Sequence, residues 1–349
     1  MATEHTTAKH TKIDIPSLQK LSVDVFRHAG LSLEDAGMAS RILVEADMMG
    51  VGTHGVLRLD SYTDRLRSGG MNRNARITVD KRSPSLALVD GDNGLGPVVG
   101  SKALNAAIEM AGDTGMAYVG CRNSNHFGAL AAYAIQACEA GFVFMGGTNA
   151  STTICPWGGR EARIGNNPVS IAAPCRNGFH FILDMAMSVV ARGKIRAARD
   201  NGTPIPVGWA VDKNGLPTTD PVDALAGFLL PVGGYKGSGF SMAVDMLSGV
   251  LTGGRFLTGI SSWADNPEAP SGIGHFFVLI DPDKLIGHES FAAAMDRFQD
   301  IVLGTPPAVE SNPVVLPGQI EQARRRKALT EGIEISSALL ASIKALASN

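Results

Sequence analysis

The stretch ALVDGDNGLGPVVGSKALNAAIEM (87–110) decides which class of fold this chain adopts. It runs from an apolar segment through Gly94, Gly96 and Gly100 into a helical pattern, the order in which a doubly wound dinucleotide-binding (Rossmann) fold begins. That fold requires G-x-G-x-x-G, and here the third glycine falls one residue late. Pro97 also removes a backbone N–H where phosphate contacts are needed. We therefore interpret the stretch as a glycine-rich turn followed by a helix with proline in its first turn.

The composition is that of a globular protein with well-buried cores. The chain has 349 residues, of which 44% are hydrophobic and 18% charged, a mixture too apolar for disorder. The net charge is −2 and no basic stripe occurs, so a nucleic-acid partner is not expected. No apolar run approaches the ~20 residues that span a bilayer, so no membrane partner is expected either.

The four cysteines show neither disulfide nor zinc spacing. They are Cys121, Cys138, Cys155 and Cys175. A chain of this length does not need disulfides, so free thiols in a reducing compartment are the expectation, and no metal site is predicted. The first 15 residues are polar and lack the apolar core of a signal peptide. A cytoplasmic protein is therefore expected.

Helical and strand patterns neither alternate strictly nor segregate along the chain. Residues 14–70 read as helical, with Ser32 and Asp35 as a capping box, and 142–185 as a series of short strands. The tail from 320 onward is helical again. We predict an α+β fold with a helical domain built from both chain ends (1–75 with 312–349) and a β-rich region, 76–311, that carries the sites for cofactor and substrate.

His54 lies at the start of a predicted helix that runs from Thr53 to about Arg67. On such a helix His54, Arg58 and Tyr62 share one face. An imidazole beside a guanidinium suits proton transfer to a carboxylate-bearing substrate. The alternative is a solvated face near a capped helix end.

His126 follows Asn123, Ser124 and Asn125 between a predicted strand and a predicted helix over 127–139. The unsatisfied first-turn amides of such a helix favour an anion, and the imidazole would then be at hand as acid or base. The alternative is that Ser124 caps the helix and His126 is an ordinary surface residue.

Two further residues are candidates. Lys236 lies among glycines, including Gly237, in PVGGYKGSGF (231–240), a loop whose amides and ammonium suit a phosphate. Asp184 ends an otherwise apolar strand, where a carboxylate needs a partner. That partner is either an imidazole that it orients or a helix N-terminus that it caps.

Seven motifs, in order, resemble the malate/L-lactate dehydrogenase-like oxidoreductase family, which includes ureidoglycolate dehydrogenase, 2,3-diketogulonate reductase and the Δ1-piperideine-2-carboxylate reductases. They are THGVLRLDSY (53–62), NSNHFGALAAYA (123–134), PWGG (156–159), DMAMSVVARGKI (184–195), IPVGWAVDKNGLPTTDP (205–221), LLPVGGYKGSG (229–239) and LPGQIEQARRRKALTEGIEI (316–335). The resemblance implies hydride transfer with NAD or NADP, a largely antiparallel, non-Rossmann cofactor-binding domain, and a homodimer.

The same resemblance implies roles for individual residues. His54 and His126 match proton-transferring histidines, Asp184 the carboxylate that supports the catalytic histidine, and Arg58, with Tyr62 beside it, the binding site of the substrate carboxylate. The implied cofactor contacts are His126, Phe127, Gly128, Ala129, Leu130, Asp184, Met185, Ala186, Met187, Ser188, Lys236, Gly237, Pro317, Gly318 and Gln319.

Three departures from the family pattern bear on specificity. Thr53 replaces a serine, Asn166 stands where the family has threonine, and Gln319 replaces a glutamate. The expected reaction is oxidation of a small 2-hydroxy acid to the 2-keto acid, and its reverse. The alternatives are reduction of a cyclic imine carboxylate on the same scaffold and a cofactor-binding homologue without turnover.

Overall fold

The computed structural model describes residues 10–176 and 178–348. The first nine residues, part of the polar start in which no signal peptide was predicted, lie outside the described ranges. The α-helices are α1 (Ile15–His28), α2 (Leu33–Met48), α3 (Leu59–Ser68), α4 (Gly96–Thr114), α5 (Leu130–Glu139), α6 (Arg192–Asp200), α7 (Pro221–Ala226), α8 (Tyr235–Asp245), α9 (Pro282–Ile286), α10 (His288–Leu303), α11 (Gln319–Glu331) and α12 (Ser337–Leu346). Short 3-10 turns are η1 (Gly52–His54), η2 (Val56–Arg58) and η4 (Leu257–Gly259), and η3 (Met246–Val250) is a π-helical turn.

The strands form one large sheet and two small ones. They are β1 (His10–Ile13), β2 (Thr78–Ser83), β3 (Leu86–Asp90), β4 (Met116–Ser124), β5 (Val143–Thr148), β6 (Val169–Ala173), β7 (Phe181–Met185), β8 (Ala210–Val211), β9 (Phe228–Leu229), β10 (Ile273–Ile280) and β11 (Ile333–Ser336). The seven-stranded sheet has the order β2-β3-β4-β10-β5-β6-β7, in which β3 and β4 pair in parallel and the other neighbours are antiparallel. This mixed, mainly antiparallel sheet agrees with the prediction.

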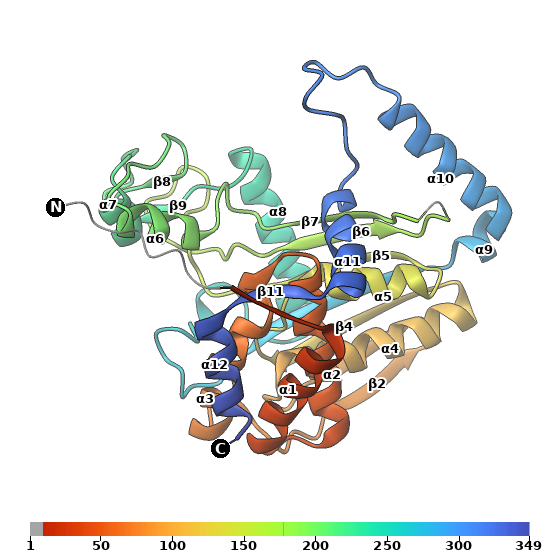
Figure 1. The fold of residues 1–349 in the computed structure, drawn as a ribbon, viewed down its shortest axis with the longest axis horizontal. Helices are drawn as coiled ribbons and strands as arrows, with labels where there is room; N and C mark the ends of the chain where they lie inside the picture. Colours follow the sequence, from red (N-terminus) through yellow and green to blue (C-terminus); the bar gives the residue numbers. More distant parts are fainter. Residues whose placement is uncertain (1–9, 177, 349) are drawn as a thin grey trace.

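Both faces of the sheet are covered, which explains why its central strands are almost wholly apolar. Successive side chains of a strand point to opposite faces. Along β10, Phe277 and Leu279 pack into the core with α4 and α5, whereas Phe276 and Val278 pack with Val244 of α8. The layers are visible in Figure 1, where α4 and α5 lie on the sheet.

The two ends of the chain pack together. β1 pairs with β11 in antiparallel register, and the core formed by α1, α2 and α3 also contains Ala328, Ile335, Leu340 and Ile343 from the tail. Arg325 of α11 pairs with Glu45 of α2 at 2.5 Å. Figure 1 shows the red and blue ends of the chain side by side. The domain limits 1–75 with 312–349 and 76–311 stay a prediction.

Two predicted helix starts are wrong, and one is confirmed. Ser32 Oγ accepts a hydrogen bond from Asp35 N and caps α2 as predicted. Thr53 does not start a helix, because the chain forms η1 and η2 and becomes helical only at Leu59; Gly55 between them is extended. The helix expected over 127–139 begins at Leu130 instead, since Gly128 has a φ of +86° that no α-helix accommodates.

The glycine-rich turn at 94–100 is used for close packing. α4 begins at Gly96 and has proline in its first turn, as predicted. A Cβ at Gly96 would lie 2.2 Å from the carbonyl oxygen of His126, and one at Gly100 would lie 2.8 Å from the hydroxyl of Tyr133. These glycines therefore let the first turn of α4 press directly against the segment that carries His126.

This packing predicts opposite outcomes for two glycines of the same helix. We expect Gly96→Ala to lower the free energy of unfolding by ~3 kcal/mol or more, because the new methyl group collides with backbone that has no room to move. The matched control is Gly112→Ala, whose Cβ would meet nothing closer than 3.9 Å. Because alanine has the higher helix propensity, the control is expected to be neutral or to gain about 0.5–1 kcal/mol. Urea unfolding of both variants checks this, and equal stabilities would contradict it.

Candidate functional site

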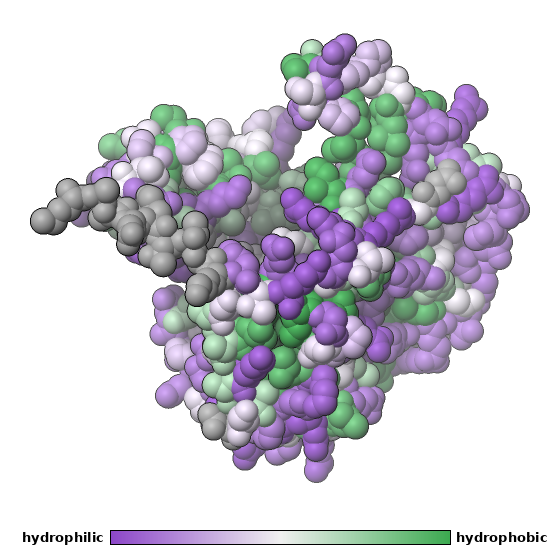
Figure 2. Space-filling view, in the orientation of Figure 1, coloured by the Kyte–Doolittle hydropathy of each residue, from purple (hydrophilic) through white to green (hydrophobic). Residues whose placement is uncertain are grey.

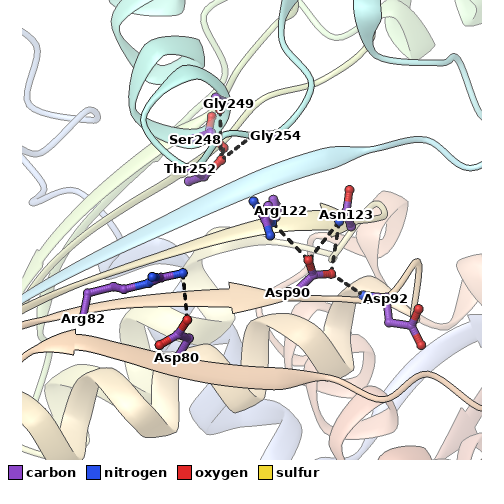
Figure 3. Close-up of polar contacts among 10 residues, drawn as sticks. All are labelled: Asp80, Arg82, Asp90, Asp92, Arg122, Asn123, Ser248, Gly249, Thr252 and Gly254. Carbon is purple, nitrogen blue, oxygen red and sulfur yellow. Dashed lines mark hydrogen bonds and ion pairs between the residues drawn. The ribbon is translucent and has the colours of Figure 1, made fainter.

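The end of β4 is bent into the site by a carboxylate on the neighbouring strand. Asp90 accepts hydrogen bonds from Arg122 Nε at 3.0 Å and from Asn123 Nδ2 at 3.1 Å (Figure 3). Asn123 has a φ of +52°, a conformation that asparagine tolerates better than most residues. Asn125 Nδ2 then donates to the carbonyl of Gly94 at 2.8 Å. These contacts fix the backbone immediately before His126.

A buried histidine supports the same segment from the sheet. His275 of β10 is fully buried between two hydroxyls, with Nε2 2.8 Å from Ser124 Oγ and Nδ1 2.8 Å from Thr148 Oγ1. Its ring stacks on Phe127 at a centroid distance of 3.9 Å. Burial lowers the pKa of His275 to about 3, so the ring is neutral. Ser124 and Phe127, on either side of His126, are therefore held by one side chain.

His126 is the centre of a cluster of rings. Its Nδ1 lies 2.5 Å from the hydroxyl of Tyr62, a fully buried side chain of α3. Its ring stacks on His54 at 5.4 Å and lies 5.8 Å from the ring of Trp263. Burial, and then the charges of His54 and Arg58, hold the pKa of His126 well below its ordinary value. The two histidines that were candidates from the sequence are thus neighbours.

The turns η1 and η2 present His54 and Arg58 to this cluster. His54 Nδ1 lies 3.0 Å from Thr53 Oγ1, and Arg58 Nε donates to the carbonyl of Thr53 at 2.7 Å. The Arg58 guanidinium lies 5.3 Å from the centroid of the Trp263 ring. Burial, reinforced by Arg58, lowers the pKa of His54 to about 4.

A buried carboxyl group of α2 holds the backbone of these turns. Asp47 of α2 accepts a hydrogen bond from Val56 N at 2.7 Å, and burial raises its pKa to about 7. A Cβ at Gly55 would lie 2.0 Å from Asp47 Oδ1, so a larger residue there would displace the carboxylate that holds Val56 N. The pair explains why the expected helix is broken between His54 and Arg58.

A cavity of about 630 Å³ opens beside His54. It lies between the start of α5, the end of β7 and the chain that leads into α11. Its walls gather many of the expected cofactor contacts, namely Gly128, Ala129, Leu130, Asp184, Met185, Ala186, Pro317 and Gly318. In Figure 2, apolar side chains are exposed in the hollow below the arm formed by α10 and the loop to α11.

Other expected contacts lie elsewhere. The side chain of Phe127 is in the core between His275 and Tyr133. Met187 is buried in the core cluster that contains Val244 and Phe276. The amide oxygen of Gln319 accepts from Leu316 N within its own turn. Apart from His126, the remaining three are Ser188, whose buried Oγ has no partner in the described part of the chain, exposed Lys236, and Gly237, which packs on Val232.

Asp184 caps a helix in the structure. Its Oδ2 accepts a hydrogen bond from Ala131 N in the first turn of α5 at 2.8 Å. Burial raises its pKa to about 6, while this hydrogen bond opposes the rise. Within the described residues, no hydrogen bond joins Asp184 to His54 or His126. The capping interpretation left open from the sequence is the one the geometry supports, and Asp184 also faces the cavity.

Sequence reasoning missed three residues of the site. Trp263 and Asp47 lie in stretches without a motif, and His275 lies in β10, whose sequence is otherwise that of an apolar core strand. Only the polar character of His275 in an apolar run gave a signal, because a buried imidazole needs hydrogen-bond partners. Among the described residues, no helix is long and apolar enough to cross a membrane.

Comparison with known proteins identifies close relatives. The family model described as malate/L-lactate dehydrogenase matches residues 13–344. The L-sulfolactate dehydrogenase of Methanocaldococcus jannaschii is 39% identical over 93% of both chains, and the NAD⁺-dependent ureidoglycolate dehydrogenase of Escherichia coli is 36% identical over 93% of this chain and 92% of its own. The structure of Δ1-piperideine-2-carboxylate reductase from Pseudomonas syringae pvar. tomato superposes with a TM-score of 0.88 at 31% identity, covering 96% of this chain and 99% of the other.

The capping geometry predicts a difference between two substitutions at Asp184. Asp184→Ala should lower the free energy of unfolding by ~1 kcal/mol, because the first turn of α5 loses its acceptor. Asp184→Asn should keep most of the stability, since its amide oxygen can accept the same Ala131 N–H. Thermal unfolding of both variants measures the difference. If the asparagine variant is as unstable as the alanine variant, the charge rather than the capping oxygen stabilises the helix.

Proposed function

We propose that this chain, which belongs to the malate/L-lactate dehydrogenase family, transfers a hydride between a nicotinamide cofactor and C2 of a small 2-hydroxy or 2-keto acid. The observation that carries the proposal is the cluster of His126, Tyr62, His54 and Arg58 beside the cavity. A guanidinium that can bind a carboxylate lies in the same cluster of side chains as two neutral imidazoles that can accept a hydroxyl proton.

The cavity fits a nicotinamide cofactor. Its volume of about 630 Å³ is within the usual range of cofactor pockets, and its walls are mainly aliphatic. Gly128 and Gly318 both have positive φ and expose their backbone to the cavity. When bound, the cofactor accepts or supplies the hydride. We place it against β7 and α5, at the edge of the mainly antiparallel sheet, and not at the glycine-rich turn before α4.

His126 is the proton-transferring group in this proposal. We assign its Nδ1–H as the donor to Tyr62 Oη, which leaves the Nε2 lone pair free to take the hydroxyl proton of the substrate. The lowered pKa keeps the ring neutral and therefore ready to act as a base. Tyr62 then acts as a positioning residue for His126, instead of the separate substrate contact expected from the sequence. Arg58 binds the carboxylate, and His54 lies between this group and the cavity.

Two other functions remain as alternatives. A cyclic imine carboxylate has the carboxylate that Arg58 would bind, and the structural relative from Pseudomonas syringae pvar. tomato is named as such a reductase. A homologue that binds cofactor without turnover is disfavoured because His54, Arg58, Tyr62 and His126 are assembled. All four cysteines are free thiols, which supports a reducing compartment such as the cytoplasm.

The proposal is tested by following reduced cofactor with purified protein. NADH and NADPH are each offered with pyruvate, oxaloacetate, longer 2-keto acids, 2,3-diketogulonate and a cyclic imine carboxylate. Turnover of a 2-keto acid is expected. Turnover of the imine alone would instead support the reductase, and cofactor binding without any turnover would support the non-catalytic homologue.

On the substrate identified, His126→Asn should lower kcat for oxidation about 10²- to 10⁴-fold, while cofactor affinity changes little. His54→Asn is the matched variant, and its smaller effect on kcat would assign the base to His126. Because the pKa of His126 is low, kcat/KM for oxidation in the wild type should stay constant from about pH 8 to below about 6.5 and fall only at lower pH. Equal kcat losses in both variants would contradict the assignment.

A homodimer is also proposed, on the exposed apolar side chains of α8, η3 and the residue that follows η3. They are Tyr235, Phe240, Met242, Met246, Val250 and Leu251. Apolar side chains gathered in this way on a monomer typically mark an interaction surface, and an isologous dimer buries the same patch on both copies.

The dimer is tested by changing one residue of that patch. Met246→Glu should shift the mass measured by light scattering from dimer toward monomer, because the dimer would bury an unpaired charge. Val207→Glu, at an even more exposed residue before β8, is the control and should leave the dimer intact. A wild-type protein that is monomeric at high concentration would contradict the proposal.

A further inference from the structure

Trp263 belongs to a loop that leaves the sheet region and returns to it. The loop comprises residues 261–271, between η4 and β10. Its base is closed by a hydrogen bond from Ser261 N to the carbonyl of Ser271, and the turn around Trp263 by one from Asn266 N to the carbonyl of Ser262. The sequence SSWADNPEAPS gives no motif, and no role was expected for it.

The loop is anchored to α3 by a buried arginine. Arg65, 1% exposed, donates to the carbonyls of Pro267 at 3.0 Å and Ala269 at 2.9 Å. Its Nη2 also donates to the carbonyl of Gly70 at 3.0 Å, and a Cβ at Gly70 would lie 1.9 Å from the carbonyl oxygen of Pro267. Two of these carbonyls, those of Pro267 and Ala269, belong to the loop, so the buried guanidinium ties the segment that follows Trp263 to α3.

The indole contacts two groups that serve different parts of the substrate. Its ring lies 5.3 Å from the Arg58 guanidinium and 5.8 Å from the ring of His126. Under the proposed function, Arg58 holds the carboxylate carbon C1 and His126 faces the oxygen on C2. A substrate attached at both points has its C2 beside the indole, so the substituent that begins at C3 is confined by the ring.

We propose that Trp263 is a specificity-determining residue that limits the size of the C3 substituent. The substrate class is then 2-hydroxy and 2-keto acids with a short, unbranched third carbon, the size of pyruvate or oxaloacetate. Branched and aromatic 2-keto acids collide with the indole. Arg65 ties the part of the loop that follows Trp263 to α3, which opposes a movement of the indole away from Arg58 and His126. This inference rests on the proposed function.

The test compares two substrates across three variants. The substrates are pyruvate and phenylpyruvate, and the quantity is the ratio of their kcat/KM values. Trp263→Ala should raise the ratio of phenylpyruvate to pyruvate at least about 10-fold, since a single methylene in an apolar pocket already discriminates by about 10- to 200-fold. Trp263→Phe should give an intermediate ratio. Trp209→Phe alters a tryptophan of the separate core around Ile154 and Ile195 and should leave the ratio unchanged.

The ratio of the two kcat/KM values separates the steric effect of the indole from the loss of its contact with Arg58. Loss of the cation–π contact should raise KM for both substrates alike and cancels in the ratio. An unchanged ratio in the alanine and phenylalanine variants, with wild-type turnover of pyruvate intact, overturns this inference and leaves the proposed function standing. Absence of wild-type turnover on every keto acid overturns both.

A binding measurement covers the case in which the alanine variant does not fold. Oxamate, an unreactive isostere of pyruvate, is titrated in the presence of a fixed concentration of reduced cofactor while tryptophan emission is followed. A change of emission is expected in the wild type and in Trp209→Phe, and its loss in Trp263→Phe. A change that persists in Trp263→Phe shows that the carboxylate binds away from this indole and overturns the inference.

Discussion

The contact between Gly96 and the carbonyl of His126 is the constraint on which the site depends. A Cβ at position 96 would lie 2.2 Å from that oxygen, so the first turn of α4 and the His126 segment touch backbone to backbone. The adjoining turn contributes the carbonyl of Gly94, to which Asn125 donates. The glycines that suggest a phosphate-binding loop in the sequence pack closely in the structure, and Gly96 brings the start of α4 against the segment that carries the histidine.

The short helix α3 connects three parts of the site, which are Arg58, His126 and the loop that carries Trp263. α3 begins directly after Arg58, presents Tyr62 to His126, and one turn later uses Arg65 to fix the Trp263 loop. α3 itself packs in the core formed by the two chain ends, whereas His126 and Trp263 belong to the segments around the large sheet. The site therefore lies where the chain-end helices meet the sheet, and a shift of either layer would separate Arg58 from His126.

The sequence predicts the regular elements better than the site geometry. The strands over 142–185, the helix starts at Ser32 and before Pro97, and the choice of His54, Arg58 and His126 as candidate residues follow from local patterns or from the resemblance. The breaks at Gly55 and Gly128 do not, because each depends on a contact with a side chain of another element, Asp47 in one case and Ile42 in the other. Trp263 and His275 were missed for the same reason, since their roles depend on contacts with residues more than 100 positions away.

If Arg58 binds the substrate carboxylate and His126 takes the proton, as proposed, electrostatics joins substrate binding to proton transfer in this arrangement. Arg58 contributes to the lowered pKa of both His54 and His126, and burial adds the larger part. A bound carboxylate neutralises the guanidinium and so removes the contribution of Arg58, which raises the affinity of the imidazoles for a proton. The free enzyme thus holds neutral histidines, and the complex holds histidines that accept a proton more readily at the moment when the hydroxyl must lose one. The pKa seen in kcat should then lie above the pKa seen in kcat/KM, because the first belongs to the complex and the second to the free enzyme.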